Sequence, residues 1–303
     1  MRILVTGGAG FIGANLVRVL LDEGYQVRVL DNFSAGRREY LAGLDLEIVE
    51  GTILDPGAVV QAVAGMKGVV HLAAQTGVPG SLQDPRRDCE VNVIGTLNVL
   101  EACRHAGVRR FVFASSNAPL GRQPPPATED KAPLPISPYG ASKLAGEGYC
   151  LAYHGSWGLG TVVLRFANIY GPYSAHKNSV VAKFFKDIQT TGQITIDGDG
   201  QQTRDFIHVG DLCQAILLAL ESDVGGEVFQ IATGVETSIH ELAAMVQEVA
   251  GSPVEVRHGP ARQGDIRKNY SGVAKARAEL GWEPEIVLGQ GLKLTWDWFH
   301  RWM

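Results

Sequence analysis

Short apolar runs alternate with helical stretches along the first half of the chain. The runs have the length of strands and show no polar alternation, which is typical of parallel strands that helices cover on both faces. They span residues 2–6, 25–30, 46–49, 68–72, 110–114 and 161–166. Between them, apolar residues recur at helical spacing over 14–21, 92–105 and 139–153. Strands that alternate with helices predict an α/β fold with a doubly wound parallel sheet.

The pattern changes after about residue 167. Proline residues separate short mixed elements there, at Pro172, Pro253, Pro260 and Pro284. We predict a first domain over residues 1–166 and a smaller C-terminal lobe over 167–303. We also expect the chain to return to the first domain around 205–235.

The first predicted strand ends in a glycine-rich turn that opens a helix. The turn reads Gly7-Gly8-Ala9-Gly10-Phe11-Ile12-Gly13. Glycine permits a tight turn and lets the backbone approach a pyrophosphate, which the helix N-terminus attracts. Because the chain has 37 glycines, the spacing alone is weak evidence. Its place between a strand and a helix is the context that a Rossmann-type dinucleotide site requires.

Asp31 closes the second predicted strand, 18 residues after Gly13. A carboxylate there can accept hydrogen bonds from both ribose hydroxyls of an adenosine, and it would repel a 2′-phosphate. Asp31 therefore favours NAD over NADP, although Arg37 and Arg38 follow closely and weaken the preference. The alternative interpretation is a glycine-rich turn followed by a surface aspartate.

Tyr139 and Lys143 are four residues apart, so a helix places them on one face. The pKa of a free tyrosine is about 10, but a neighbouring ammonium and a positive nicotinamide ring favour the phenolate and would lower this pKa. Such a phenolate can take a proton from an alcohol while a hydride leaves the same carbon. A hydroxyl of Ser115 or Ser116, at the end of a predicted strand, could share that proton. A lone pair of this kind is more often a packed tyrosine beside a solvated lysine, so the glycine-rich turn supports the interpretation.

The composition limits the partners and the compartment. A formal net charge of −5 argues against a general nucleic-acid or anionic-membrane binder. No apolar run approaches the roughly 20 residues that a membrane-spanning helix needs. The four cysteines form no Cys-x-x-Cys pair, and none has a histidine at zinc-ligand spacing. We therefore expect reduced thiols, no metal site and a cytoplasmic protein.

Eight segments, in order along the chain, resemble those of one family. They include Tyr139-Gly140-Ala141-Ser142-Lys143 and cover residues 5–13, 71–75, 92–96, 115–116, 139–143, 165–172, 203–209 and 262–265. With these segments the chain resembles the extended short-chain dehydrogenase/reductases, specifically the nucleotide-sugar epimerases and dehydratases. The resemblance implies NAD as cofactor, a nucleoside-diphosphate sugar as substrate, a C-terminal lobe that binds this substrate, and a homodimer.

The resemblance also implies a role for each matched residue. Ser116, Tyr139 and Lys143 would be catalytic. NAD would be held by Gly7, Gly10, Phe11, Ile12, Gly13, Asp31, Asn32, Ile53, Leu72, Ala73, Ala74, Asn92, Ser115, Tyr139 and Lys143. The substrate would be held by Ser116, Asn168, Arg204, Arg262 and Asp265. Two arginines suit its diphosphate, because guanidinium groups bind phosphate oxygens through paired hydrogen bonds.

Three reactions of this family share hydride removal from the sugar C4, with Tyr139 taking the O4 proton. An epimerase returns the hydride to the other face of C4, a dehydratase eliminates water across C5 and C6, and a decarboxylase loses a C6 carboxylate. The resemblance associates dehydratases with an Asp-Glu pair after the catalytic hydroxyl and decarboxylases with a nearby Glu. Here Asn117-Ala118-Pro119-Leu120 follows Ser116.

Elimination needs a positioned carboxylate, so we predict C4 epimerisation of a hexose of the UDP-glucose/UDP-galactose type. Asn168, where glucuronate epimerases tend to have Thr, points to a neutral hexose. The enzyme alternative is a dehydratase or a uronate decarboxylase/epimerase, and the non-enzyme alternative is an NAD-binding sensor module. Asp197 stands where the family often has an aromatic residue near the nucleobase, which leaves the base open. Thr52 stands where members of the family commonly have an aspartate that contacts the adenine.

Overall fold

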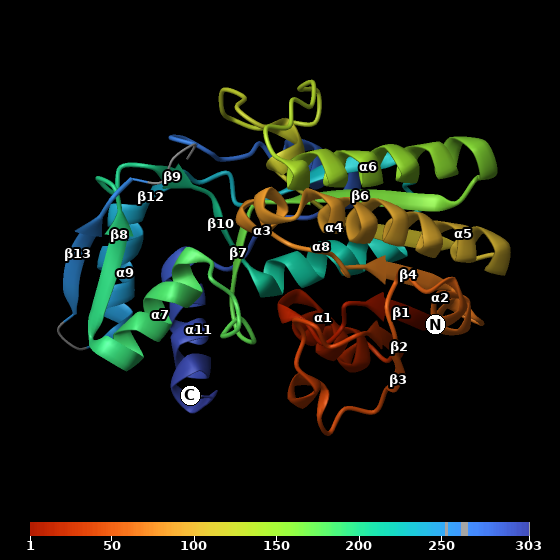
Figure 1. The fold of residues 1–303 in the computed structure, drawn as a ribbon, viewed down its shortest axis with the longest axis horizontal. Coiled ribbons are helices and arrows are strands. Elements are labelled where there is room, and N and C mark those ends of the chain that lie inside the picture. Colours follow the sequence, from red (N-terminus) through yellow and green to blue (C-terminus); the bar gives the residue numbers. More distant parts are fainter. Residues whose placement is uncertain (252–253, 262–265, 303) are drawn as a thin grey trace.

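A seven-stranded sheet forms the centre of the larger lobe in the computed structural model, which describes residues 1–251, 254–261 and 266–302 (Figure 1). Every strand pair in this sheet is parallel. In spatial order the strands are β11 (Glu227–Ile231), β6 (Gly160–Phe166), β5 (Arg110–Ser116), β4 (Gly68–His71), β1 (Arg2–Thr6), β2 (Gln26–Asp31) and β3 (Glu47–Glu50). This confirms the predicted α/β class with a doubly wound sheet. The order reverses between β1 and β4, the place where such sheets bind ligands at their carboxyl ends.

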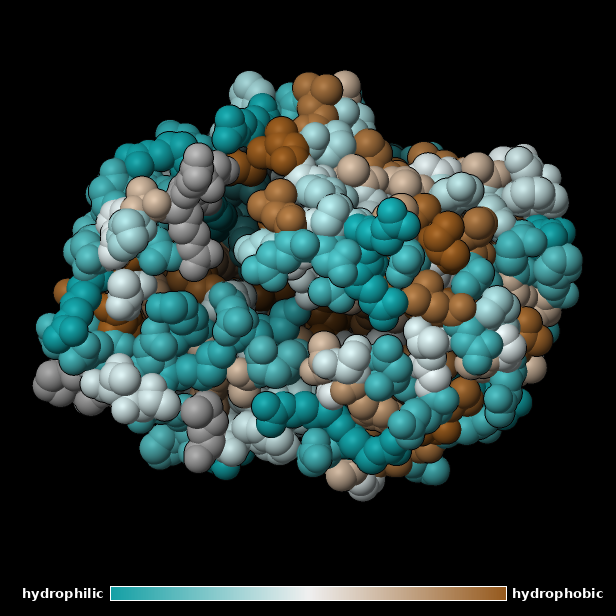
Figure 2. All heavy atoms as spheres, viewed as in Figure 1, coloured by the Kyte–Doolittle hydropathy of each residue, from teal (hydrophilic) through white to brown (hydrophobic). Residues whose placement is uncertain are grey.

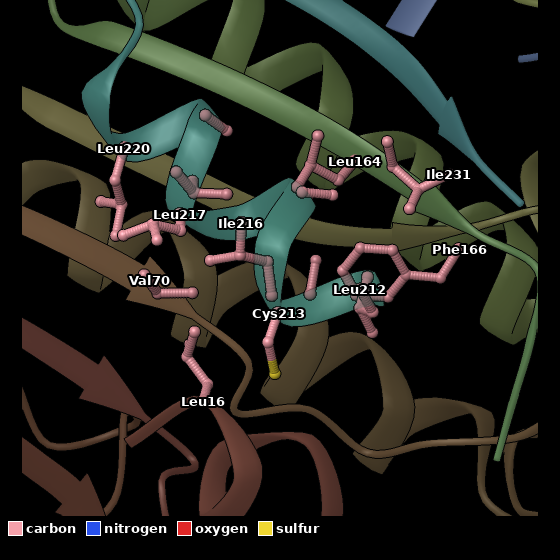
Figure 3. Packing of buried hydrophobic residues seen from close by; sticks show 14 of the residues in the cluster. Leu16, Val70, Leu164, Phe166, Leu212, Cys213, Ile216, Leu217, Leu220 and Ile231 are labelled. Carbon is pink, nitrogen blue, oxygen red and sulfur yellow. The ribbon is translucent and has the colours of Figure 1, made fainter. Parts of the chain in front are cut away.

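Helices cover both faces of the sheet, as the continuous apolar strands predict. One face carries α2 (Pro56–Val63), α5 (Thr96–Ala106) and α6 (Pro138–Trp157), and the other carries α1 (Phe11–Asp22), α8 (Val209–Glu221) and α10 (Ala274–Leu280). Alternate side chains of β1 separate accordingly, because Ile3 and Val5 pack on the α1/α8 side and Leu4 on the α2/α5 side. Figure 3 shows α8 with its buried residues Leu212, Cys213, Ile216, Leu217 and Leu220, packed with Leu16, Val70, Leu164, Phe166 and Ile231.

The observed elements extend or shift several predicted ones. The second strand ends at Asp31, and β5 extends through Ser115 and Ser116. Helix α6 begins at Pro138, where the Ser137 hydroxyl accepts a hydrogen bond from the Gly140 amide. The helix predicted to begin at Asn92 begins earlier, with α4 (Pro85–Cys89), continues through a π-helical turn (Glu90–Gly95) and then becomes α5. A separate short helix, α3 (Val78–Gln83), precedes it. Two 3-10 turns span Arg38–Leu41 and Ala118–Leu120.

In its described residues the smaller lobe contains three two-stranded sheets and three helices. The sheets pair β7 (Asn168–Tyr170) with β10 (Phe206–His208), β9 (Thr203–Arg204) with β12 (Thr237–Ser238), and β8 (Gln193–Asp197) with β13 (Glu255–Gly259). The helices are α7 (Val180–Thr191), α9 (Ile239–Ala250) and α11 (Leu288–Trp302), which share an aromatic-rich core. Among the described residues, no helix is both long and apolar enough to cross a membrane.

Candidate active site

The glycine-rich turn closely contacts the loop that follows β4. Gly7 has a φ of 72°, and a Cβ atom there would lie 2.8 Å from the Ala73 amide nitrogen. A Cβ atom on Gly13 would lie 2.3 Å from the Gly7 carbonyl oxygen. Only glycine fits these two positions, so the backbone stays open at the N-terminus of α1. This is the cradle that the pyrophosphate of a dinucleotide requires.

Asp31 lies at the end of β2 with its carboxylate fixed by backbone amides. Its Oδ2 accepts from Ala9 N at 2.9 Å and its Oδ1 accepts from Phe33 N at 2.8 Å. Burial raises the pKa of Asp31, and the two amide hydrogen bonds oppose that rise. Each oxygen still has a lone pair, so the carboxylate can accept hydrogen bonds from ribose hydroxyls.

A single cleft brings together most residues that the sequence assigned to the site. It runs across the carboxyl ends of the central strands and opens between the two lobes, where Figure 2 shows a hollow with hydrophilic residues along much of its rim. The assigned residues along the cleft are Gly7, Gly10, Phe11, Ile12, Gly13, Asp31, Asn32, Ile53, Leu72, Ala73, Ala74, Ser115, Ser116, Tyr139, Lys143, Asn168 and Arg204.

Three assigned residues are not placed along this cleft. Asn92 is 1% exposed and lies behind it, where its amide binds the backbone of Gln75. Asn92 therefore supports the loop after β4, and its contact with NAD stays a prediction. Arg262 and Asp265 lie outside the described residues.

Ser116, Tyr139 and Lys143 meet where β5 ends beside the first turns of α6. The Ser116 hydroxyl accepts from the Ala118 amide at 3.2 Å and neighbours the Tyr139 phenol, whose pKa it lowers. Lys143 is 4% exposed, and its Nζ donates to the Ala114 carbonyl oxygen at 2.8 Å. The ammonium also lies 4.9 Å from the centroid of the Phe113 ring. The structure therefore holds the two hydroxyls and the ammonium of the predicted set at one end of the cleft.

The pKa values in this cluster differ from the expectation for Tyr139. Burial raises the pKa of Tyr139 to about 12, and the Ser116 hydroxyl opposes that rise. Burial also lowers the pKa of Lys143 to about 8. Around the phenol the loss of hydration dominates, so the predicted decrease in the tyrosine pKa depends on the positive charge of the nicotinamide ring.

Ser115 is committed to a buried ion pair beneath the cleft. Its Oγ donates to Glu147 Oε1 at 2.5 Å. Arg165 donates to both oxygens of the same carboxylate, with Nε at 2.9 Å and Nη2 at 2.7 Å. Because this interaction occupies the Ser115 hydroxyl, Ser116 is the serine whose hydroxyl is directed to Tyr139.

The other end of the cleft carries cationic and amide side chains from the smaller lobe. Arg204 is anchored by Nη1 to the carbonyl oxygens of Thr203 and Ile266, each at 2.7 Å. Asn168 donates to the Asp205 carbonyl oxygen at 3.2 Å. Lys177, which the sequence did not indicate, also lines the cleft and donates to Thr76 Oγ1 at 3.1 Å. No local pattern marks Lys177, because its partner is 101 residues away in the chain.

Comparison with known proteins matches residues 3–232 to the NAD dependent epimerase/dehydratase family. The chain belongs to this family. It is 39% identical to the UDP-glucose 4-epimerase of Mycolicibacterium smegmatis, with 99% of each protein covered. A solved UDP-glucose 4-epimerase from Thermotoga maritima, with UDP-glucose, has a TM-score of 0.95 and 39% identity over 99% of both chains. Another from Thermus thermophilus, in complex with NAD, has a TM-score of 0.93 and 39% identity over 100% of both chains.

Family membership makes NAD the cofactor and agrees with the resemblance found in the sequence. The glycine cradle and the Asp31 carboxylate fit this cofactor. Dehydratases and decarboxylases of nucleotide sugars are among the further relatives, so the family covers several reactions that act on such sugars.

Proposed function

We propose that this protein is a 4-epimerase of a UDP-hexose of the glucose/galactose type, with NAD retained through each cycle. The observation that carries the proposal is the distribution of carboxylates along the cleft. Among the described residues that line it, only Asp31 and Asp197 are acidic. Asp31 ends β2, three strands away from the β5 end that carries Ser116, which is about 14 Å at the usual strand spacing. Asp197 belongs to β8 in the smaller lobe.

Elimination of water across C5 and C6 needs an acid and a base beside those carbons. The turn after Ser116, Ala118–Leu120, supplies neither. For a 4-keto sugar held at this end of the cleft, the reaction that remains is therefore return of the hydride to C4. Return to the opposite face is epimerisation.

The proposed mechanism uses the cluster at the end of β5. NAD, held by the glycine-rich turn and Asp31, would supply a hydride acceptor and donor beside the sugar C4. Tyr139, once it is the phenolate, would accept the O4 proton directly and become the phenol, while the neighbouring Ser116 hydroxyl would hold O4 by a hydrogen bond. Lys143 is fixed by the Ala114 carbonyl and carries its positive charge at pH 7, which favours the phenolate. Both proton steps reverse when the hydride returns to the opposite face.

Substrate binding is proposed to use the smaller lobe. Arg204 and Asn168 would bind the diphosphate, because their side chains line the cleft and are anchored to backbone carbonyls. Roles for Arg262 in diphosphate binding and Asp265 in binding the nucleoside ribose remain predictions, as does the homodimer.

The test is turnover of UDP- and dTDP-sugars, with the products identified by NMR. We expect interconversion of UDP-glucose and UDP-galactose. Tyr139→Phe should abolish turnover and leave NAD bound, whereas Tyr149→Phe, an exposed tyrosine of the same helix, should change neither. A 4-keto-6-deoxy sugar or carbon dioxide as product would overturn the epimerase proposal. Full activity of Tyr139→Phe would overturn the assignment of the base.

A further inference from the structure

A buried carboxylate lies behind the catalytic pair and has no role in the mechanism above. Asp88, in α4, is 1% exposed. Its Oδ1 accepts from Asn92 Nδ2 at 3.0 Å, and its Oδ2 is buried without a hydrogen-bond partner among the described residues. A buried charge of this kind costs several kcal/mol unless an opposite charge balances it. Its placement therefore calls for a physical explanation.

A short hydrogen-bond network connects Asp88 to the first turn of α6. Asn92 Nδ2 also lies 3.1 Å from Ser142 Oγ, and Ser142 Oγ donates to the Tyr139 carbonyl oxygen at 3.1 Å. The same asparagine binds both backbone groups of Gln75, through Oδ1 at 2.8 Å and Nδ2 at 3.0 Å. The π-helical turn that carries Asn92 thus joins the carboxylate, the catalytic helix and the cleft wall.

Among the charged groups around Asp88, we take Lys143 as the counter-ion of its carboxylate. Lys143 and Tyr139 face it from α6, which packs against α4. Glu147, one turn further along α6, is taken up by Arg165. On the β4 side His71 is neutral, because burial lowers its pKa to about 3. Other ionisable groups around these elements include Cys150 on α6, and Asp84, Arg86, Arg87, Cys89 and Glu90 in the segment of Asp88 itself.

Lys143 is the buried cation that can balance the charge of Asp88. It is buried, its Nζ hydrogen bond goes to a neutral carbonyl, and no carboxylate among the described residues lies within 4.0 Å of its Nζ. Building on the proposed function, we propose that Asp88 is a positioning residue whose fixed negative charge keeps Lys143 protonated while Tyr139 exchanges its proton with the sugar. The network through Asn92 holds this charge at a constant place.

The direction of the electrostatic effect agrees with this role. The Asp88 charge raises the pKa of Lys143, against the burial that lowers it to about 8. It also raises the pKa of Tyr139. Removal of the charge should therefore lower both pKa values, and Lys143 would lose its proton closer to neutral pH.

The test is the pH profile of kcat for Asp88→Asn, with Asp84→Asn as the matched control. Asp84 caps the same helix and is exposed, and asparagine still caps a helix. We expect both limbs of the Asp88→Asn profile to move to lower pH by about one unit, and Asp88→Glu to restore them. The Asp84→Asn profile should match the wild type. A lower kcat with unmoved limbs would show that Asp88 is structural only and would overturn the proposal.

Two further measurements separate the possible failures. If Asp88→Asn does not fold, Asp88→Ser removes the charge with a smaller side chain, and the same shift is required of it. If the wild type turns over no nucleotide sugar, the proposed function fails, and Asp88 is judged without substrate. In the NAD-loaded protein, the phenolate absorbance of Tyr139 is obtained by subtracting the spectrum of the matching Tyr139→Phe protein. It should appear at lower pH in Asp88→Asn, and an unchanged titration would overturn the proposal.

Discussion

Gly13→Ala tests whether the crowded glycine turn is what holds NAD. The added methyl group would lie 2.3 Å from the Gly7 carbonyl oxygen and 2.5 Å from Gly8 Cα. Both atoms belong to the turn itself, so no flexible side chain can move aside and the backbone must shift. Overpacking of this kind costs about 1–3 kcal/mol. If this free energy is lost from NAD binding, the dissociation constant for NAD rises by about 5- to 150-fold.

The assay is titration of the cofactor-free protein with NAD by calorimetry, beside thermal unfolding of the same samples. Gly148→Ala is the matched control, because Gly148 is also within a helix and a Cβ atom there meets nothing within 4 Å. This control should bind NAD normally and gain about 0.5–1 kcal/mol of stability, since alanine favours a helix interior. An NAD affinity of Gly13→Ala within twofold of the wild type would refute the reasoning.

Two further predictions concern buried ionisable groups. Glu147→Gln leaves Arg165 buried and unpaired, which should cost about 3–5 kcal/mol and lower Tm by roughly 10 °C. Arg109→Gln, which breaks an exposed pair with Asp223, should leave Tm unchanged in the same scan, and equal losses would contradict the argument. Burial lowers the pKa of His71 to about 3, so as the pH decreases the unfolded chain is protonated at this residue before the folded protein is. Stability therefore falls as the pH decreases from 6.5 toward 3. Urea unfolding should show a loss of about 2 kcal/mol from this group between pH 7 and pH 5, and His71→Asn should lack it; parallel pH dependences would contradict the assignment.

The sequence predicted the larger lobe well because its signals are local. A strand buried on both faces needs an unbroken apolar run, and β1 and β6 form from runs of this kind that have the length of a strand. Helix α2 was missed although Asp55 and Pro56 give its cap and first turn, because eight residues show little periodicity. The glycine turn and the Tyr139 helix were recognised for the same reason, since each motif is contiguous.

Features that depend on distant partners could not be predicted from the sequence. The π-helical turn carries Asn92, whose partners Gln75 and Ser142 are 17 and 50 residues away. The change in the Tyr139 pKa depends on how deeply the hydroxyl is buried, and spacing along a helix does not report that depth. Local patterns indicate which groups are present, whereas packing determines their protonation.

The position of β11 at the edge of the sheet affects how the chain must fold. β11 pairs with β6, but the residues between them build β7, α7, β8, β9, β10 and α8 first. A nascent chain that has emerged only as far as β6 therefore has an unpaired strand edge, the kind of edge that promotes aggregation. That edge is covered only after residue 231 has left the ribosome. The part of the smaller lobe from β7 to β10 is thus synthesised before the central sheet can be completed.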